Sequence, residues 1–402
     1  MPAVAARNAF AQCEALYFER CREKFPRLDV LAAKWEVEDL LPGLSDLDFR
    51  LIVDASVGLE AFIALDSVIG AVHAALCNER PDWARMLEHP PGVIVTWDEL
   101  HDPCLFNPET RCWRVCGGDA VRFDQYRYEV LREPWTLADE RYCVERFAGY
   151  FGPYQPHIDV PINVAGREQA YAWHSRAMHY FAPAVQSAVS VMDRRVVPGK
   201  LQALRRAAEL IKNEAVFQET IERVECGYIT NDRASVDALR GFEERLWRAM
   251  HRLKAAMDAN RELLGEARHE PLKVFSDGLR YIRCRRGRLS FYLNAPSHFD
   301  ASLLIRGDLE KLRMQTIKRG LLGGYGQLKC GRPDATLDDI LAAAGPLLAG
   351  GRDVDLLKKF TNLLHQHRPE NTRETASQVV PLLDDTCRVL DRLFQDARRI
   401  AT

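Results

Sequence analysis

The feature that most constrains this chain is a pair of carboxylates at the start of a short apolar run, in the stretch Leu41-Pro-Gly-Leu-Ser-Asp-Leu-Asp-Phe-Arg-Leu-Ile-Val-Asp54. Side chains alternate between the faces of a strand, so Asp46 and Asp48 should point to one face and the intervening apolar residues to the other. Two adjacent carboxylates repel each other unless a cation lies between them, and oxygen ligands favour Mg²⁺. Gly43 and Ser45 precede the pair and supply a tight turn and a hydrogen-bond donor suited to a polyphosphate. The stretch therefore predicts a buried strand with a metal site at its mouth.

The motif Ser45-Asp46-Leu47-Asp48-Phe49, followed by an apolar strand and then a helical stretch, resembles the metal-binding signature of the polymerase-beta-like nucleotidyltransferase superfamily. In that superfamily the motif opens the second core strand, and its two aspartates hold Mg²⁺ against the triphosphate of a nucleotide. The resemblance is confined to the part of the chain before about residue 130. It implies that Asp46 and Asp48 are metal ligands and catalytic residues, that Mg²⁺ is the cofactor, and that a nucleoside triphosphate (NTP) is the substrate.

The superfamily also has a Gly-Ser pair upstream of this motif, which grips the nucleotide phosphates. The corresponding stretch here is Ala32-Ala33-Lys34-Trp35, which contains no Gly-Ser pair. We interpret Lys34 as a substitute that contacts a phosphate by charge, and Gly43 and Ser45 complete the predicted phosphate-binding residues. The missing pair leaves open two alternatives, a diverged family and a relative that has lost catalysis.

A third acid is needed on a neighbouring strand if two metal ions are to assist nucleotidyl transfer. Asp124 is the first candidate, because it lies in the middle of a predicted strand among apolar residues and would bind metal together with Asp46 and Asp48. Asp98, at the end of the predicted strand over 93–97, is the second candidate, and Glu129 is the third. Any of them could instead be a solvent-facing strand residue.

The charge balance argues against a chain that is basic throughout and clamps nucleic acid, because 55 Lys and Arg against 57 Asp and Glu give a net charge of −2. A composition with 47% hydrophobic and 28% charged residues is typical of a soluble globular protein. The sequence shows neither a continuous apolar run of roughly 20 residues, which crossing a bilayer requires, nor a signal-peptide core. We therefore expect a cytoplasmic protein without membrane contact, whose eleven cysteines are mostly reduced and buried.

Hydrophobic periodicity predicts an α/β head at the start of the chain. The expected elements, in order, are a helix over 5–24, a short helix from about residue 30, the strand that follows Asp48, a helix over 57–78 capped by Ser56, a short helix from Pro81, and a strand over 93–97. A hairpin is predicted next, from Cys112–Cys116 and Ala120–Val130 joined by Gly117-Gly118-Asp119. These elements are compatible with the small mixed sheet of a nucleotidyltransferase.

Helical periodicity dominates from Trp135 onward, with prolines between the helical segments. One β interruption is predicted near 279–293, a hairpin with its turn at Arg286-Gly287. Its arginines either contact phosphate or nucleic acid, or form a solvated strand edge guarded by charge. We expect an α+β fold with a small mixed-sheet, nucleotidyltransferase-like head at 1–134, a helical domain at 135–270, and a mainly helical C-terminal region at 271–402.

The expected function is that of a Mg²⁺-dependent nucleotidyltransferase, which moves a nucleoside monophosphate from an NTP to an acceptor and releases pyrophosphate. The mildly acidic balance favours a small molecule or a protein side chain as the acceptor, held between the head and the helical body, over long nucleic acid. Two alternatives stay open. One is a non-catalytic binding or scaffold protein on a degenerate nucleotidyltransferase fold, and the other is an RNA-modifying nucleotidyltransferase that uses the arginines near 279–293.

Overall fold

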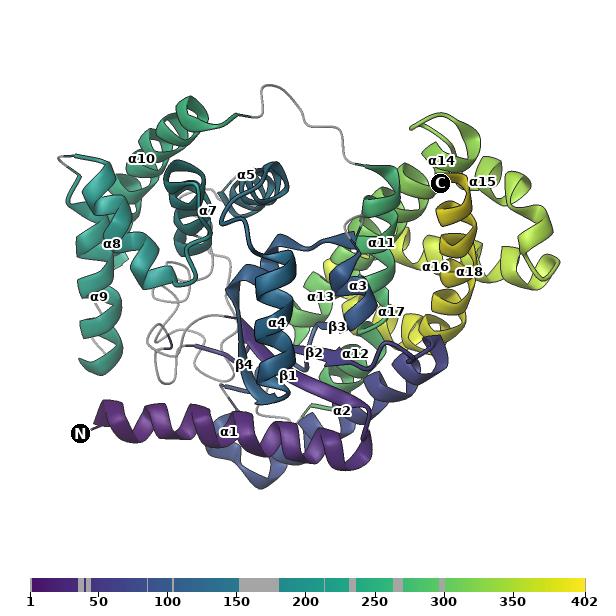
Figure 1. The fold of residues 1–402 in the computed structure, drawn as a ribbon, viewed down its shortest axis with the longest axis horizontal. Helices are drawn as coiled ribbons and strands as arrows, with labels where there is room; N and C mark the ends of the chain where they lie inside the picture. The colour runs from purple at the N-terminus through teal and green to yellow at the C-terminus, as the bar shows by residue number, and fades with distance from the viewer. Residues whose placement is uncertain are drawn as a thin grey trace.

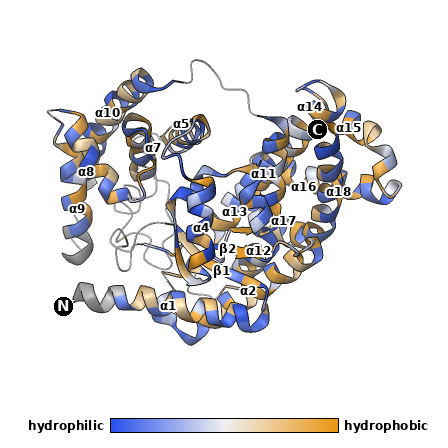
Figure 2. Cartoon of the chain, in the orientation of Figure 1, coloured by the Kyte–Doolittle hydropathy of each residue, from blue (hydrophilic) through white to orange (hydrophobic). Residues whose placement is uncertain are grey.

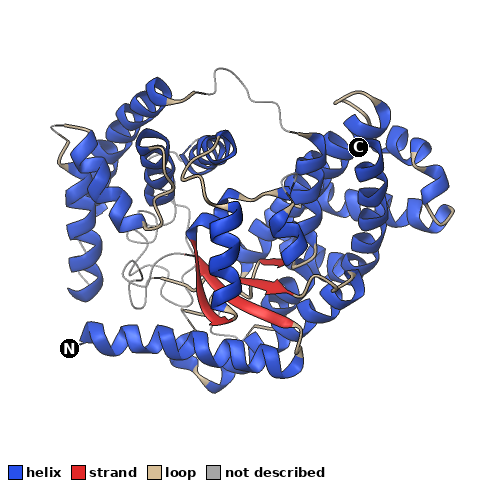
Figure 3. Cartoon of the chain, in the orientation of Figure 1, coloured by secondary structure: helices blue, strands red, loops and turns tan. Residues whose placement is uncertain are grey.

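The computed structural model describes residues 2–34, 40, 45–84, 86–102, 105–151, 181–212, 214–230, 236–262, 270–295 and 301–401. Within these ranges a small mixed β-sheet is combined with a body that is mostly helical (Figure 1, Figure 3). The expected α+β class is therefore confirmed at this level. The predicted site residue Gly43 lies outside the described residues.

The sheet has four strands within the described ranges, in the order β3-β2-β1-β4. The strand β1 (Leu28–Lys34) is antiparallel to both β2 (Phe49–Val53) and β4 (Trp113–Gly118). The strand β3 (Val93–Thr96) runs parallel to β2, which makes the sheet mixed. The short helix expected from about residue 30 is wrong, because this stretch forms β1 between two strands and is almost entirely buried.

Helices cover both faces of the sheet (Figure 1). On one face lie α1 (Pro2–Lys24) and α2 (Leu59–Glu79), and Leu51 of β2 joins their core. On the other face lies α4 (Ala120–Val130), and Ile52 of β2 joins that second core. Neighbouring residues of β2 thus serve opposite layers, as strand geometry requires. The strands are mostly hydrophobic in Figure 2, whereas hydrophilic and hydrophobic stretches alternate along the helices.

Among the described helices, α2 has a length and hydropathy that would suffice to cross a membrane. This is weak evidence, because the core helix of a soluble protein meets the same criterion. Its apolar residues are used inside the fold, where they pack in the core with α1 and the sheet: Phe62, Leu65, Ile69, Val72 and Leu76.

Residues 120–130 form the helix α4, so the second strand of the predicted hairpin is wrong. Asp119 begins this helix, and its Oδ1 accepts a hydrogen bond of 2.9 Å from the backbone N–H of Arg122. Phe123 and Tyr126, three residues apart, are buried against the sheet. The apolar residues therefore follow helical spacing as well as alternation, and the capping aspartate decides between the two.

Short elements connect the parts of the head. They are the 3₁₀ turn at Pro81–Trp83, α3 (Trp97–His101) and the 3₁₀ turn at Pro108–Cys112. Beyond the head, a first group of helices shares its own hydrophobic core. Its members are α5 (Leu137–Phe151), α7 (Ala182–Asp193), α8 (Lys200–Leu210), α9 (Val216–Thr230) and α10 (Val236–Asn260).

A second group of helices forms another core at the C-terminal end of the chain. It contains α11 (Pro271–Ile282), α12 (Arg285–Leu293), α13 (Ser302–Lys311), a π-helical stretch (Leu312–Tyr325), α14 (Gly326–Cys330), α15 (Leu337–Ala343), α16 (Gly351–Gln366), α17 (Thr372–Val379) and α18 (Leu383–Ala401), with 3₁₀ turns at Gly345–Leu347, Pro369–Asn371 and Val380–Leu382. The predicted hairpin near 279–293 is wrong, because α11 and α12 occupy these residues. The domain boundaries at 134 and 270 stay predictions.

The contact between α12 and α2 depends on two glycines. Gly287 was expected in a turn but lies inside α12, where a side chain would collide with the backbone oxygen of Asp66 in α2. A Cβ on Gly70 of α2 would in turn lie 3.1 Å from the Gly287 Cα. The absence of both side chains lets the two helices cross closely, and this crossing fixes α12 beside the sheet.

Candidate functional site

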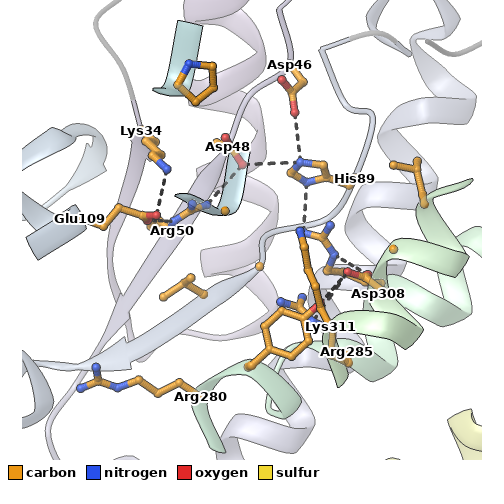
Figure 4. Close-up of a pocket in the computed structure, with 18 of the residues that line it drawn as sticks. Lys34, Asp46, Asp48, Arg50, His89, Glu109, Arg280, Arg285, Asp308 and Lys311 are labelled. Carbon is orange, nitrogen blue, oxygen red and sulfur yellow. Dashed lines mark hydrogen bonds and ion pairs between the residues drawn. The ribbon is translucent and has the colours of Figure 1, made fainter. Parts of the chain in front are cut away.

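Asp46 and Asp48 lie in an extended segment that leads into β2. The backbone N–H of Leu47 donates a hydrogen bond of 2.9 Å to the carbonyl oxygen of Met86, and that of Lys34 donates one of 3.1 Å to the carbonyl oxygen of Asp48. Leu47 is buried in the core with α1 and α2. Alternation therefore directs the two flanking carboxylates away from that core and into a cleft (Figure 4).

The cleft has a volume of about 730 Å³. It is lined by residues at the N-terminal ends of β2 and β3, by residues of α5 and α8, and by residues of α11, α12 and α13. Most of the lining residues are charged, with side chains of both signs, and a few are apolar. Its size falls within the range of roughly 300–1,000 Å³ that is typical of sites for small molecules.

A third side chain, His89, joins the two aspartates. Its Nε2 lies 3.0 Å from Oδ2 of Asp46 and 3.5 Å from Oδ1 of Asp48. One ligand atom from each of the three residues lies within 4.8 Å of the others. The second ring nitrogen, Nδ1, lies 3.2 Å from the carbonyl oxygen of Pro90, the kind of partner that orients metal-binding histidines. The arrangement of these three side chains could hold a divalent metal ion.

Sequence reasoning missed His89, although the sheet explains its position. The parallel register pairs Arg50 of β2 with Val93 of β3. The segment that precedes β3 also lies beside the aspartates, because the backbone N–H of Leu47 donates to the carbonyl oxygen of Met86. His89 belongs to this segment, so its position can be predicted only when β2 and β3 are known to be parallel neighbours. The sequence by itself indicated only that a helix ends before Pro90.

The three side chains fit a hard divalent cation in two ways. Carboxylates suit Mg²⁺ and Mn²⁺, whereas an imidazole is a better ligand for a transition metal than for Mg²⁺. With Mn²⁺, His89 can serve as a third ligand beside the aspartates. With Mg²⁺, its Nε2–H can instead donate to Asp46, while Nδ1 accepts from Nη1 of Arg288 at 3.3 Å. Both versions leave the two aspartates as the primary ligands.

A buried ion-pair cluster supports Asp48 from the side. Glu109 accepts hydrogen bonds from Nζ of Lys34 at 2.9 Å and from Nε of Arg50 at 2.7 Å. Burial opposes ionisation of Glu109, but the two cations hold its pKa well below its usual range. Nη1 of Arg50 also lies 3.6 Å from Oδ1 of Asp48. Burial likewise raises the pKa of Asp48, yet Arg50, His89 and Lys34 lower it overall, so the carboxylate is ionised at neutral pH.

Basic side chains from α12 and α13 form the opposite wall of the cleft (Figure 4). Nε of Arg288 lies 3.1 Å from Oδ2 of Asp308, and Nε of Arg285 lies 3.9 Å from Oδ1 of the same carboxylate. The guanidinium of Arg285 also lies over the ring of Tyr281 at 3.5 Å. Burial opposes ionisation of Asp308, but Arg288 and Arg285 lower its pKa well below the usual range. Lys311 adds a further positive charge to this wall.

The third wall comes from α5 and α8, which contribute Arg146, Tyr150 and Lys200. Burial lowers the pKa of Lys200, and this effect outweighs the opposite influence of Asp46 and Asp48. Burial raises the pKa of Tyr150, but the positive charge of Arg146 and of nearby lysines lowers it overall. The electrostatic environment of this wall is thus positive, like that of the wall formed by α12 and α13.

The structure does not bring the three proposed third acids to the aspartate pair. Asp124 lies on α4 with a side chain that is 73% exposed, and its Oδ1 lies 3.7 Å from Nη1 of Arg127. Asp98 is exposed in the first turn of α3. Glu129 lies near the end of α4, and its Oε2 lies 3.5 Å from Nε2 of His101. None of the three lines the cleft, because the predicted strand that carried two of them is a helix.

The other predicted phosphate-binding residues lie close to the aspartates. Lys34 lines the cleft, where its ammonium group is paired with Glu109. Ser45 directly precedes Asp46 in the same extended segment. A contact of either residue with a phosphate stays a prediction.

The arginines near 279–293 divide into two groups. Arg283, one of the arginines of the predicted hairpin, is buried, and its Nη1 lies 2.6 Å from Oε1 of Glu99. Arg286 forms an ion pair with Asp384 of α18. Arg283, directly after α11, is thus joined to α3, and Arg286 joins α12 to α18, whereas Arg285 lines the cleft. The expected charged hairpin edge is therefore wrong, and its arginines have structural or cleft-facing positions instead.

Comparisons of the chain with known protein families, characterised proteins and solved structures give no match. The site itself combines a metal-ligand group on one side of the cleft with buried basic side chains on the other. A ligand that carries both a cation and several negative charges fits this arrangement.

Proposed function

We propose that the protein is a metal-dependent nucleotidyltransferase, which transfers a nucleoside monophosphate from an NTP to an acceptor and releases pyrophosphate. One observation carries the proposal. Asp46, Asp48 and His89 face a wall of arginines across a cleft of small-molecule size. The acidic side suits a divalent cation and the basic side suits phosphates, and a metal–triphosphate complex offers both.

In this proposal the aspartates bind the metal ion, and His89 either binds it as well or orients Asp46. A bound metal would neutralise and polarise the phosphoryl groups of the nucleotide. Arg50 keeps Asp48 ionised while its own charge is balanced by Glu109, which leaves the aspartate able to bind a cation. The ion-pair cluster of Lys34, Arg50 and Glu109 thus fixes both the charge and the position of Asp48 as a metal ligand.

The topology of the sheet supports the proposal, because it agrees with the resemblance to the polymerase-beta-like superfamily. The Asp-x-Asp motif opens the second strand of a small mixed sheet, and a helix connects that strand to a parallel third strand. The third strand, Val-Ile-Val-Thr over 93–96, carries no acid. Two of the other carboxylates that line the cleft, Glu109 and Asp308, are each held by two cations. Among the described residues Asp46 and Asp48 belong, with His89, to the one group that could hold a metal ion, so the proposal is for a single metal ion there.

The acceptor would lie on the side of the cleft formed by α5 and α8. Tyr150 and Lys200 face the cleft there and could contact a hydroxyl or a carboxylate of an acceptor. A small molecule or a protein side chain fits a cleft of this volume. The net charge of −2 disfavours a long nucleic acid as the acceptor.

Thermal unfolding of the full chain with each NTP, in the presence of Mg²⁺ or Mn²⁺, tests the proposal. A ligand that binds only the folded state raises Tm by mass action. We expect at least one NTP to raise Tm in a metal-dependent way, and Asp48→Asn to remove this rise. Asp124→Asn, an exposed carboxylate outside the cleft, is the control and should leave it unchanged.

Pyrophosphate release in the presence of a metabolite extract or of tRNA would then identify the class of acceptor. Release with the extract supports a small-molecule acceptor, whereas release only with tRNA supports the RNA-modifying alternative. If no triphosphate shifts Tm at millimolar concentration, the proposal fails and a non-catalytic binding protein on this fold is the better interpretation.

A further inference from the structure

The wall formed by α12 and α13 carries more positive than negative charge. Its cations are Arg285, Arg288, Arg306 and Lys311, and its carboxylates within the described residues are Asp308, which Arg285 and Arg288 share, and Glu310, which lies 4.0 Å from Nε of Arg306. Lys311 forms no ion pair with any residue of the described ranges. Arg285 and Arg288 are largely buried, whereas Lys311 is exposed. Neighbouring groups of like charge repel each other, so the excess is stabilised when an anion lies between them.

The buried position of Arg285 makes this excess unusual. Its side chain is about 5% exposed, and its Nε lies 3.9 Å from Oδ1 of Asp308. This Nε has no hydrogen-bond partner in the described part of the chain. A buried charged donor without a partner costs free energy. The stacking of Arg285 on Tyr281 holds the guanidinium plane in place without using its donors. Nη1 of Arg285 donates to the carbonyl oxygen of Cys284 at 3.3 Å, so it is the Nε–H that lacks an acceptor among the described residues.

The two guanidinium groups converge on Gly92, the residue before β3. A Cβ built on Gly92 would lie 2.8 Å from Nη1 of Arg288, and 3.6 Å and 3.8 Å from the two terminal nitrogens of Arg285. Nη1 of Arg288 lies 3.3 Å from Nδ1 of His89, so this point adjoins the metal-ligand group. Arg288 already donates from Nε to Asp308, from Nη1 to the Pro90 carbonyl oxygen and from Nη2 to the Tyr292 hydroxyl, so it supplies positive charge at this point beside the donors of Arg285.

The described residues where the superfamily has its Gly-Ser pair, which end at Lys34, do not offer such donors. The stretch Ala32-Ala33-Lys34-Trp35 replaces the pair, and the ammonium group of Lys34 is held by Glu109 at 2.9 Å. The α12 and α13 wall has the free donor and the excess charge that the end of β1 lacks.

We propose that Arg285, Arg288 and Lys311 form a polyphosphate subsite, which holds the two terminal phosphates of the nucleotide. This inference rests on the proposed function and goes beyond it, because it moves the phosphate grip from the end of β1 to the C-terminal helices. The metal ion beside Asp48 and the subsite then bind neighbouring parts of one triphosphate. The leaving pyrophosphate would remain among these three side chains until it is released.

Isothermal titration of the full chain with inorganic tripolyphosphate, at fixed ionic strength and with the metal removed by EDTA, tests the subsite alone. We expect binding by the wild type and a loss of about tenfold in affinity for Lys311→Met, since a charge-assisted contact is removed. Lys318→Met is the matched control, because Lys318 is also exposed but does not line the cleft. It should change the affinity little.

Gly92→Ala provides a second test that keeps every charge. The added Cβ displaces Nη1 of Arg288, which is the flexible end of a side chain, so the fold is expected to survive, as circular dichroism would show. We expect several-fold weaker tripolyphosphate binding. Unchanged affinity in both Gly92→Ala and Lys311→Met would overturn the inference. Equal weakening by Lys318→Met would overturn it too, because it would reveal a general charge effect.

The experiment separates this inference from the proposed function. Asp48→Asn should leave metal-free binding of tripolyphosphate in place while it abolishes the metal-dependent shift of Tm by an NTP. If the NTP shift is absent but tripolyphosphate binds and depends on Lys311, the subsite stands and the transferase does not. If the NTP shift is present and insensitive to Lys311→Met, the transferase stands and the subsite is wrong.

Discussion

The imidazole Nε2 of His89 lies 3.0 Å from the carboxylate Oδ2 of Asp46. The two residues are far apart in the sequence, and the parallel pairing of β2 with β3 brings them together. On its other side the imidazole lies against the carbonyl oxygen of Pro90, 3.2 Å from Nδ1. A histidine fixed between a carboxylate and a backbone carbonyl is already oriented for a metal ion.

Replacement of this imidazole should weaken metal binding in a way that depends on the ion. We expect His89→Ala to lower the affinity for Mn²⁺ by about tenfold or more, because a ligand or its orienting partner is lost. The loss for Mg²⁺ should be smaller, since Mg²⁺ prefers oxygen ligands. Isothermal titration with each ion measures both. His101→Ala, outside the cleft on α3, is the control, and equal affinities of His89→Ala and wild type would remove His89 from the site.

The ion-pair cluster around Glu109 should contribute strongly to stability. Glu109→Gln preserves the shape of the side chain but leaves Lys34 and Arg50 buried without their shared carboxylate. We expect the free energy of unfolding to fall by about 3 kcal/mol, as when one partner of a buried ion pair is removed. Urea unfolding measures this loss. Adding Lys34→Met should restore part of it, and a double variant no more stable than Glu109→Gln alone would contradict this account.

A surface ion pair provides the comparison for Glu109. Nζ of Lys254 lies 2.5 Å from Oδ2 of Asp258, and the two side chains are 48% and 32% exposed. Asp258→Asn should change the free energy of unfolding by less than about 1 kcal/mol, because solvent screens the pair. The contrast between the two substitutions tests burial as the cause.

The sequence was sufficient to predict the strand that follows the aspartate pair. Leu47 and Leu51 alternate with Asp46 and Asp48, and the structure places the two sets on opposite sides. The helix over 5–24 and the helix from Leu137 were also predicted, because their apolar residues recur with a helical period. These features depend on local pattern, which a single sequence contains.

Features that depend on contacts between distant segments could not be predicted in this way. Residues 120–130 satisfy both alternation and helical spacing, and only the cap at Asp119 favours the helix. Arg285 lines the cleft because α12 crosses α2 at Gly287, and no local sequence pattern predicts that crossing. His89 required the register of a parallel strand pair. The missing information is tertiary in each case.

The close crossing of α2 and α12 should not tolerate a side chain at Gly287. A methyl group there would meet the backbone oxygen of Asp66, which cannot move without shifting α2. We expect Gly287→Ala to lower the free energy of unfolding by about 1–3 kcal/mol, despite the better helix propensity of alanine. Gly241→Ala in α10 has open space around the new methyl group and should be neutral or stabilising, by up to about 1 kcal/mol. Urea unfolding of both variants measures the difference, and a loss for Gly241→Ala as large as that for Gly287→Ala would contradict the steric explanation.

Asp66 should make stability depend on pH. Its buried carboxyl group accepts a hydrogen bond of 2.7 Å from the backbone N–H of Gly287. Burial raises its pKa to about 7, although this hydrogen bond and Arg285 act in the opposite direction. In the unfolded chain the group should titrate near its ordinary pKa of about 3.9. The unfolded state therefore ionises Asp66 from about pH 4, whereas the folded state keeps it protonated to about pH 7.

The sign of the effect follows from proton binding. Between about pH 4 and pH 7 the folded state binds more protons than the unfolded state, so this group makes the free energy of unfolding fall as pH rises, and its effect is constant above about pH 7. Asp66→Asn keeps an oxygen acceptor for Gly287 and does not titrate. We expect the free energy of unfolding, measured with urea, to fall from pH 5 to pH 8 in the wild type. This fall should be smaller by a few kcal/mol in Asp66→Asn. Asp124→Asn should decline like the wild type. If Asp66→Asn declines equally, the carboxyl group is ionised in the folded protein and its burial does not control its charge.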